Sequence, residues 1–318
     1  MRDANSSASD RSPTLSILTP VYNAAAFLPR LFASFDRLAP EHRKRTQLVL
    51  VDDGSTDDSA QALDRFANDR HADFAEITVL RQPNGGSASA RNTGLDHATA
   101  TWLLFLDADD ELTHDPLPDL DAARPDHSCV LYAAEFVRDA RVIRRHRPPH
   151  IARDPLDTFT AENPLLTSSI AFRRALATHR LNEQIISRED WLFWIENRDV
   201  LANPLDRRRT TLSRIHIHGS NKSADHARAG RFRAQIAERL LDDPTLSLTP
   251  RQRNNLRLQA ACGHAVNGLR PALKHFARFP CDSRLYAKFL VYALFGPRIG
   301  RVDAYSAERP AGSSTKCS

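Results

Sequence analysis

Three aspartates within four positions are the residues of this sequence best suited to chemistry. Asp107, Asp109 and Asp110 directly follow the apolar run at residues 102–106, which has the pattern of a strand buried on both faces. Carboxylates this close repel one another, and a divalent cation relieves that repulsion. Oxygen ligands suit Mg²⁺ or Mn²⁺, which share their coordination with substrate phosphates. The alternative is an ordinary Asp-rich turn after a strand.

The elements that would position these aspartates alternate between strand and helix. Apolar periodicity predicts strands at residues 15–19, 47–51, 76–81 and 102–106, and helices at residues 24–38, 59–68 and 88–98. Such alternation implies right-handed crossovers and a mostly parallel sheet. Polar clusters follow each of the four strands, at residues 22–23, 52–53, 84–87 and 107–110. Because ligands bind beyond the carboxyl ends of parallel strands, we expect these clusters to share one crevice.

Four motifs in this order carry a family resemblance. They are Thr19-Pro20-Val21-Tyr22-Asn23, Val51-Asp52-Asp53-Gly54-Ser55-Thr56-Asp57, Asn84-Gly85 with Ala90-Arg91-Asn92-Thr93-Gly94, and Phe105-Leu106-Asp107-Ala108-Asp109-Asp110. Together they resemble the nucleotide-sugar-binding half of family-two glycosyltransferases of the GT-A fold. The expected fold class is therefore α/β, a doubly wound, mostly parallel sheet flanked by helices and followed by a C-terminal helical region. A Gly-x-Gly-x-x-Gly signature does not follow the first strand, which disfavours a dehydrogenase.

The resemblance implies roles for several donor-side residues. The expected nucleotide-sugar-binding residues are Pro20, Tyr22, Asn23, Asp53, Arg91 and Asp107. Asp53 would accept a hydrogen bond from the base, since a carboxylate selects a ring N–H. Alternatively, Asp52 caps a helix, Asp53 closes an Asx-turn and Arg91 is a solvated helix charge. Asp109 is the expected metal ligand, with Asp110 in a supporting or capping position.

The acceptor half is less regular. Strands are expected near residues 128–136 and 168–173, and loops at residues 146–150 and 154–164. Glu189-Asp190 before an apolar run resembles the family motif whose Asp is the catalytic base, which implies attack opposite the diphosphate and inversion. Acids are also ordinary at a helix start. Trp191 and Trp194 would stack on a sugar or belong to the core.

A later histidine-containing motif, Arg214-Ile215-His216-Ile217-His218-Gly219-Ser220-Asn221-Lys222-Ser223, resembles the family's closing motif. In it His218 matches the motif histidine, a contact for diphosphate or metal, and His216 stands where the family more often has Arg. A plain surface strand is the alternative reading of this His-x-His pair. The departure at His216 leaves the contacts to the donor phosphate open.

Composition sets the outer bounds. The chain has 318 residues and a net charge of +5. Its four cysteines lack Cys-x-x-Cys spacing, and this indicates a reducing cytoplasm and no zinc site. Neither a signal peptide nor an apolar run long enough to span a bilayer is expected. The expected organisation is a disordered lead-in (1–13), a GT-A domain (14–224, divided at 112/113 into donor and acceptor halves), a helical region (225–305) and a disordered tail (306–318).

In the helical region, helices are expected at residues 226–241, 250–267, 271–279 and 285–295. The last of these is an apolar segment flanked by arginines. Packing on the catalytic domain or on a second subunit is the favoured interpretation, and peripheral contact with the inner face of a membrane through residues 284–301 is the second.

The predicted activity is an inverting, metal-dependent sugar transfer of the hexosyltransferase type. The expected donor is a nucleotide-diphosphate-sugar, foremost a UDP-sugar, and the acceptor is a saccharide or lipid-linked hydroxyl in cell-surface polysaccharide or lipopolysaccharide biosynthesis. No nucleic-acid partner is expected. A nucleotidyltransferase would need a different first loop and has no use for Asp190, and an inactive nucleotide-sugar-binding module is the third interpretation, kept open by His216.

Overall fold

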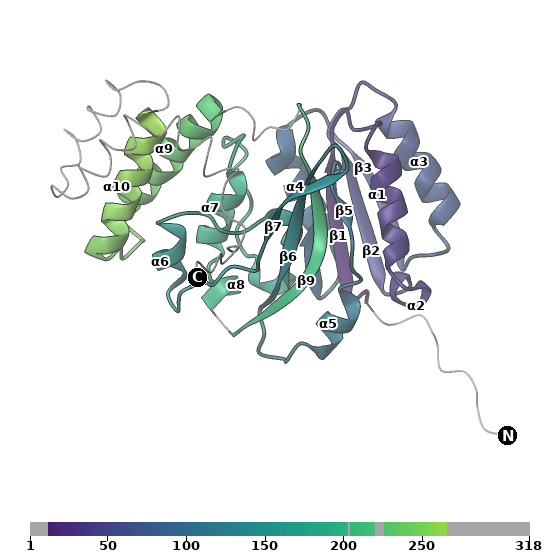
Figure 1. Cartoon of the computed structure of the whole chain (residues 1–318). Helices are drawn as coiled ribbons and strands as arrows, with labels where there is room; N and C mark the ends of the chain where they lie inside the picture. Colours follow the sequence, from purple (N-terminus) through teal and green to yellow (C-terminus); the bar gives the residue numbers. More distant parts are fainter. Residues whose placement is uncertain (1–11, 203, 220–225, 266–318) are drawn as a thin grey trace, which may run out of the picture. The chain divides into compact units, whose positions relative to one another are not determined.

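The computed structural model describes residues 12–202, 204–219 and 226–265 (Figure 1). Contacts divide the chain into two units, residues 1–224 and 225–318. The strands of the first unit are β1 (Leu15–Val21), β2 (Thr46–Asp52), β3 (Glu76–Arg81), β4 (Trp102–Phe105), β5 (Glu111–Leu112), β6 (Cys129–Arg138), β7 (Arg141–His146), β8 (Ile170–Arg173) and β9 (Leu205–His216). Its α-helices are α1 (Leu28–Ser34), α2 (Pro40–Arg43), α3 (Ser59–Arg70), α4 (Gly86–His97), α5 (Leu117–Ala122), α6 (Pro155–Phe159), α7 (Glu189–Glu196) and α8 (Asp199–Ala202).

All nine strands form one sheet in the order β3-β2-β1-β4-β8-β6-β9-β5, with β7 paired to β6. The first four strands are parallel, which confirms the predicted βα alternation. Beyond β4 the sheet becomes mixed, because β8 is antiparallel to both β4 and β6 while β9 runs parallel to β6. The observed architecture confirms the expected α/β class.

Helices cover both faces of the parallel half. On one face, apolar side chains of β1 and β2 pack against α1 and α3, with Leu31, Phe35 and Leu63 fully buried. On the other face lies α4, which approaches β1 very closely. A Cβ atom on Gly94 would lie 2.5 Å from the buried side chain of Leu18, so only glycine allows this spacing.

Two local expectations are corrected. Residues 154–164, expected as a loop, contain the short helix α6, which Asp154 caps by accepting a hydrogen bond from Leu156 N at 3.0 Å. Pro155 at the first helical position is the sequence signal for this helix, because proline is common there. The helix expected at residues 24–38 begins only at Leu28 and ends in the 3₁₀ turn Phe35–Arg37.

The described part of the second unit is a helix pair, α9 (His226–Asp242) and α10 (Pro250–Ala265). Gly263 allows the two backbones to meet, since a Cβ there would lie 2.4 Å from the carbonyl oxygen of Gly230. The helices predicted at residues 271–279 and 285–295 lie outside the described residues. In the parts of the chain that the structure describes, no helix has the length and apolarity to cross a bilayer.

Candidate active site

The three aspartates come together at the carboxyl end of β4. Asp107, Asp109 and Asp110 each offer an oxygen atom within 4.8 Å of the others. Asp110 is buried, and its two oxygens accept hydrogen bonds from the Ser168 hydroxyl (2.9 Å) and the His216 backbone N–H (3.3 Å). Asp110 therefore ties β4 to the acceptor half, while Asp107 and Asp109 remain partly exposed to solvent.

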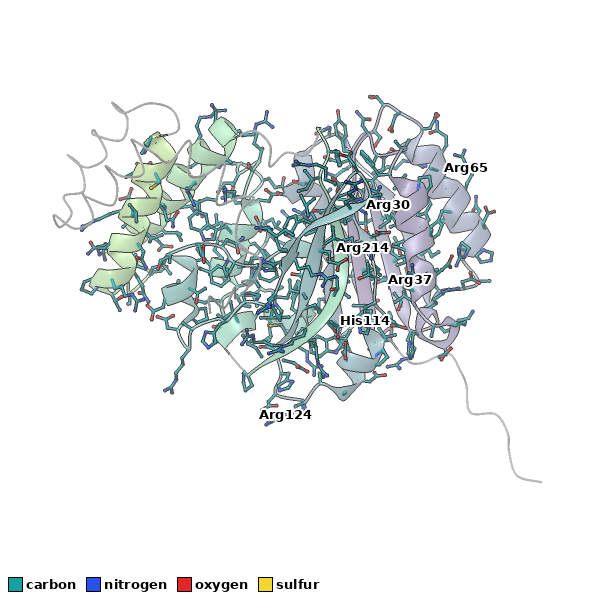
Figure 2. The ribbon with its side chains drawn as sticks, in the orientation of Figure 1. Arg30, Arg37, Arg65, His114, Arg124 and Arg214 are labelled. Atoms are coloured by element: carbon teal, nitrogen blue, oxygen red, sulfur yellow. The ribbon has the colours of Figure 1, made fainter. Side chains whose placement is uncertain are left out.

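Asp109 has partners from two other elements. The imidazole Nε2 of His218 lies 2.9 Å from Asp109 Oδ2, so the two predicted metal ligands lie side by side. The ring of Phe27 stacks on His218 with 4.5 Å between centroids. Arg30 on α1 donates to the Asp109 carbonyl oxygen at 2.7 Å; Figure 2 labels this arginine together with Arg214 on β9.

The electrostatics of this cluster fit a cation. Burial, together with the charge of Asp107, raises the pKa of Asp109 and of Asp110, because their charged forms lack sufficient compensation. A divalent ion supplies that compensation, and the partly exposed oxygens suit Mg²⁺ or Mn²⁺. Asp109, with the adjacent His218, would hold it directly, and Asp107 lies close enough to the cluster to contact a water bound to it.

Arg91 occupies the space between the aspartate cluster and α7. Its guanidinium lies 2.6 Å from Asp107 Oδ1 and 2.9 Å from Glu189 Oε1, and its side chain is only 6% exposed. Glu189 also accepts a hydrogen bond from the Ser87 hydroxyl at 2.6 Å. The alternative of a solvated helix charge is therefore wrong for Arg91, which links α4, β4 and α7.

Asp190 follows Glu189 in the first turn of α7. Its Oδ2 accepts a hydrogen bond from Asn163 Nδ2 at 2.8 Å, and no described residue donates to its Oδ1. Burial, followed by the neighbouring charge of Glu189, raises the pKa of Asp190 to about 6. A carboxylate with a free oxygen and this pKa is suited to accept a proton near neutral pH.

The other donor-side residues lie at the ends of β1 and β2. Tyr22 is 49% exposed, beside the half-buried Pro20. Asn23 adopts a left-handed backbone (φ 48°), and its Oδ1 accepts a hydrogen bond from Thr56 N at 2.7 Å. These contacts join the loops after β1 and β2, as the predicted convergence requires.

The carboxylate of Asp53 is hydrogen-bonded to other residues of the protein. Its buried carboxylate accepts hydrogen bonds, all at 2.8 Å, from the backbone N–H groups of Gly85 and Gly86 and from the side chain of Gln82. It therefore shapes the loop before α4 rather than closing a local Asx-turn. Asp52 closes the local turn instead, accepting from Ser55 N at 3.1 Å, and does not cap a helix.

Several residues escaped the sequence reasoning. Asn163 and Arg30 lie far from their aspartate partners in the chain, and no spacing signal marks them. Glu189 stood in a recognised motif, yet only packing reveals its bond to Arg91. The two tryptophans of α7 belong to the core: Trp191 and Trp194 are buried, and Trp191 Nε1 donates to the Phe159 carbonyl at 2.8 Å.

Curated relatives match part of the chain. A PGL/p-HBAD biosynthesis glycosyltransferase of Mycobacterium bovis is 41% identical over 101 residues, which is 32% of this chain and 37% of that protein. The uncharacterized glycosyltransferase EpsJ of Bacillus subtilis is 29% identical over 139 residues, 44% of this chain and 38% of that protein. The matched stretch thus spans well under half the length of these relatives.

Solved structures share the fold. TarS of S. aureus superposes with a TM-score of 0.61 at 19% identity, covering 92% of this chain and 54% of TarS. The mannosyltransferase PcManGT of Pyrobaculum calidifontis, in complex with GDP-Man and Mn²⁺, gives 0.58 at 19% identity, covering 93% of this chain and 85% of that protein. The family model described as glycosyl transferase family 2 matches residues 16–179, slightly more than half of the sequence. The chain therefore belongs to glycosyl transferase family 2.

Proposed function

We propose that this protein transfers a sugar, of the hexosyl type, from a nucleotide-diphosphate-sugar to an acceptor hydroxyl with inversion of configuration. The observation that carries the proposal is the double contact of Arg91. By touching Asp107 and Glu189 together, Arg91 sets the first turn of α7 beside the aspartate cluster. In this proposal, the base and the site for the diphosphate lie on two sides of one guanidinium.

Asp190 is the proposed base. Its carboxylate takes the proton of the acceptor hydroxyl as that oxygen attacks the anomeric carbon, on the side opposite the departing diphosphate. Asn163 holds one carboxylate oxygen and leaves the other for the acceptor. Glu189 acts as a positioning residue, because it fixes α7 without being required to touch either substrate. Arg91 positions α7 in the same way and stays a proposed donor-binding residue through its contact with Asp107.

The remaining site residues bind the donor in this proposal. Pro20, Tyr22 and Asn23 line the base and ribose pocket, and Asp107 binds the ribose or a metal-bound water. Asp53 meets the base through its remaining lone pair or acts through the loop that it shapes. A divalent ion held by Asp109 and His218, with Asp107 on the ribose or on a water bound to that ion, would neutralise charge on the leaving diphosphate.

The donor class we propose is a UDP-sugar. Structural neighbours of the same fold were solved with UDP-GlcNAc (TarS) and with GDP-Man and Mn²⁺ (PcManGT), which supports a nucleotide-sugar and a divalent metal. A relative named for PGL/p-HBAD biosynthesis supports a biosynthetic role, which we place in cell-surface polysaccharide or lipopolysaccharide assembly. Cytoplasmic localisation and membrane contact through residues 284–301 stay predictions.

Calorimetric titration of UDP, GDP, CDP and dTDP, with and without Mn²⁺, tests this proposal. We expect one nucleotide to bind in a metal-dependent manner and Asp109→Ala to abolish that dependence. Asp69→Asn, an exposed substitution on α3, is the matched control and should bind like the wild type. If no nucleotide binds under any condition, the assignment of this half of the chain is wrong.

Turnover separates an enzyme from a binding module. The nucleotide identified by calorimetry defines the donor, and release of the free nucleoside diphosphate from that donor can be followed with candidate saccharide acceptors. We expect Asp190→Asn to retain nucleotide binding and to lose release. Binding without release by the wild type, in every donor and acceptor combination, would favour the inactive module.

A further inference from the structure

The hairpin formed by β6 and β7 is strongly basic. Residues 138–147 contain five arginines and a single acid, Asp139. Arg138, Arg141, Arg145 and Arg147 are all exposed, and the side chain of Arg145 is 76% exposed although it pairs with the buried Glu135. The hairpin therefore presents a dense positive charge to solvent, and such charge favours an anionic partner.

Two aliphatic side chains are exposed within this charge. Val142 and Ile143 are each 43% exposed and are among the few large apolar side chains exposed in the described residues. The register pairs Phe136 with Arg144 and Val137 with Val142, so Ile143 is the extra residue of a β-bulge. A bulge changes the direction of the side chains at that point of a strand. Ile143 therefore does not follow the regular alternation of faces relative to Val142.

Protection of a sheet edge explains only part of this pattern. Among the described strands β7 pairs with β6 alone, and natural edges are often blunted by charges and bulges. That function does not call for adjacent exposed valine and isoleucine, which are themselves an aggregation hazard at an edge. Apolar side chains surrounded by cationic ones instead match the interface of an anionic bilayer, where headgroups meet arginines and acyl chains meet aliphatic groups.

The hairpin turn lies close to the candidate active site. Val137, one residue before the turn-forming Arg138, accepts a hydrogen bond at 2.8 Å from Ile217 N. Ile217 is followed by His218, which contacts Asp109. The turn residues Asp139 and Ala140 both have left-handed backbone, the geometry of a tight two-residue hairpin. A surface bound at the turn would therefore lie beside the site.

We propose that the β6–β7 hairpin docks on an anionic lipid surface through its exposed arginines together with Val142 and Ile143. Docking there brings the site to the membrane, where a lipid-linked acceptor would be presented; this purpose rests on the proposed function, whereas the docking itself does not.

Vesicle flotation of the full chain tests the proposal. The probes are vesicles of phosphatidylcholine alone and vesicles enriched in phosphatidylglycerol, at about 0.1 M and about 0.5 M NaCl. We expect binding to the anionic vesicles at both salt concentrations, stronger at low salt. Arg141→Glu should lower partitioning about tenfold at low salt, since each arginine near a surface contributes severalfold. The pair Val142→Ser with Ile143→Ser should lower it about tenfold at both salt concentrations, because apolar insertion is not screened.

Matched controls keep these outcomes specific. Arg65→Glu on α3 makes the same charge change at another exposed arginine, labelled in Figure 2, and Ile186→Ser removes another exposed aliphatic side chain. Both should bind vesicles like the wild type, and the circular dichroism spectrum of every variant shows whether its fold is intact. Absence of vesicle binding by the wild type overturns the proposal, as do equal losses in the controls or binding that the hairpin variants leave unchanged. Binding to soluble polyphosphate without vesicle binding also overturns it, in favour of a soluble polyanion.

Discussion

The guanidinium of Arg91 on α4 lies 2.9 Å from the carboxylate of Glu189 on α7, while the same guanidinium lies 2.6 Å from Asp107. This buried pair joins the donor half of the sheet to the helix that carries Asp190. Removal of one partner leaves the other charge buried without compensation, which is far more costly than loss of a surface pair.

We expect Arg91→Met to lower the free energy of unfolding by about 3–5 kcal/mol, because two carboxylates lose a buried counter-charge. Urea unfolding followed by circular dichroism measures this. Arg81→Met, which breaks an exposed pair with Asp64, is the matched control and should cost less than about 1 kcal/mol. In a double-mutant cycle, Glu189→Gln should recover part of the loss; strict additivity of the two substitutions would contradict the coupling.

The pH dependence of turnover should report Asp190. Because the pKa of Asp190 is about 6 and the charged form is the base, kcat/KM should fall below about pH 6 and level off above it. Asn163 donates to the charged carboxylate, so Asn163→Ala should move this acid limb upward by about one pH unit. Initial rates measured from about pH 5 to about pH 8 cover the acid limb of both proteins and would show this shift. An unchanged limb in Asn163→Ala would exclude Asp190 as the titrating group.

Stability should respond to the same group in the opposite direction. The pKa of Asp190 is about 6 in the folded protein, whereas the pKa of an aspartate in an unfolded chain is about 3.9, so the folded protein retains this proton to a higher pH. The free energy of unfolding therefore falls as pH rises through this window. At pH 8 the free energy of unfolding of Asp190→Asn should exceed that of the wild type by about 1–3 kcal/mol, and at pH 4 this difference should be absent. The size is moderate because partial exposure of Asp190 to solvent screens some of the effect. Urea unfolding in EDTA measures the difference, with Asp69→Asn as control. A gain equal at both pH values would contradict it.

Packing of α4 on β1 gives a prediction independent of catalysis. Gly94→Ala places a methyl group against the buried Leu18 and should cost about 1–3 kcal/mol by overpacking. A lower thermal midpoint, by roughly 2–10 °C, is the expected reading. Gly219→Ala, where the added Cβ meets nothing within 4 Å, is the control. Equal midpoints for both variants would mean that α4 shifts freely on the sheet.

The amino-acid sequence by itself determined the parallel half of this protein. Short apolar runs and helical periodicity are local signals, so the strands at residues 46–52, 76–81 and 102–105 followed from them closely. Convergence of the following loops, and hence the aspartate cluster, followed from the rule that parallel strands end at one edge. The resemblance to the family rested on those same local motifs.

Only the tertiary structure decided how the polar side chains are used. Asp53 is occupied by the loop before α4, Arg91 is buried between two carboxylates, and Asn163 supports Asp190. Each contact joins residues far apart in the chain, so its formation depends on how helices and strands pack and not on a local spacing. The same holds for the exposed hairpin, because exposure of Val142 and Ile143 is set by what the rest of the sheet leaves uncovered.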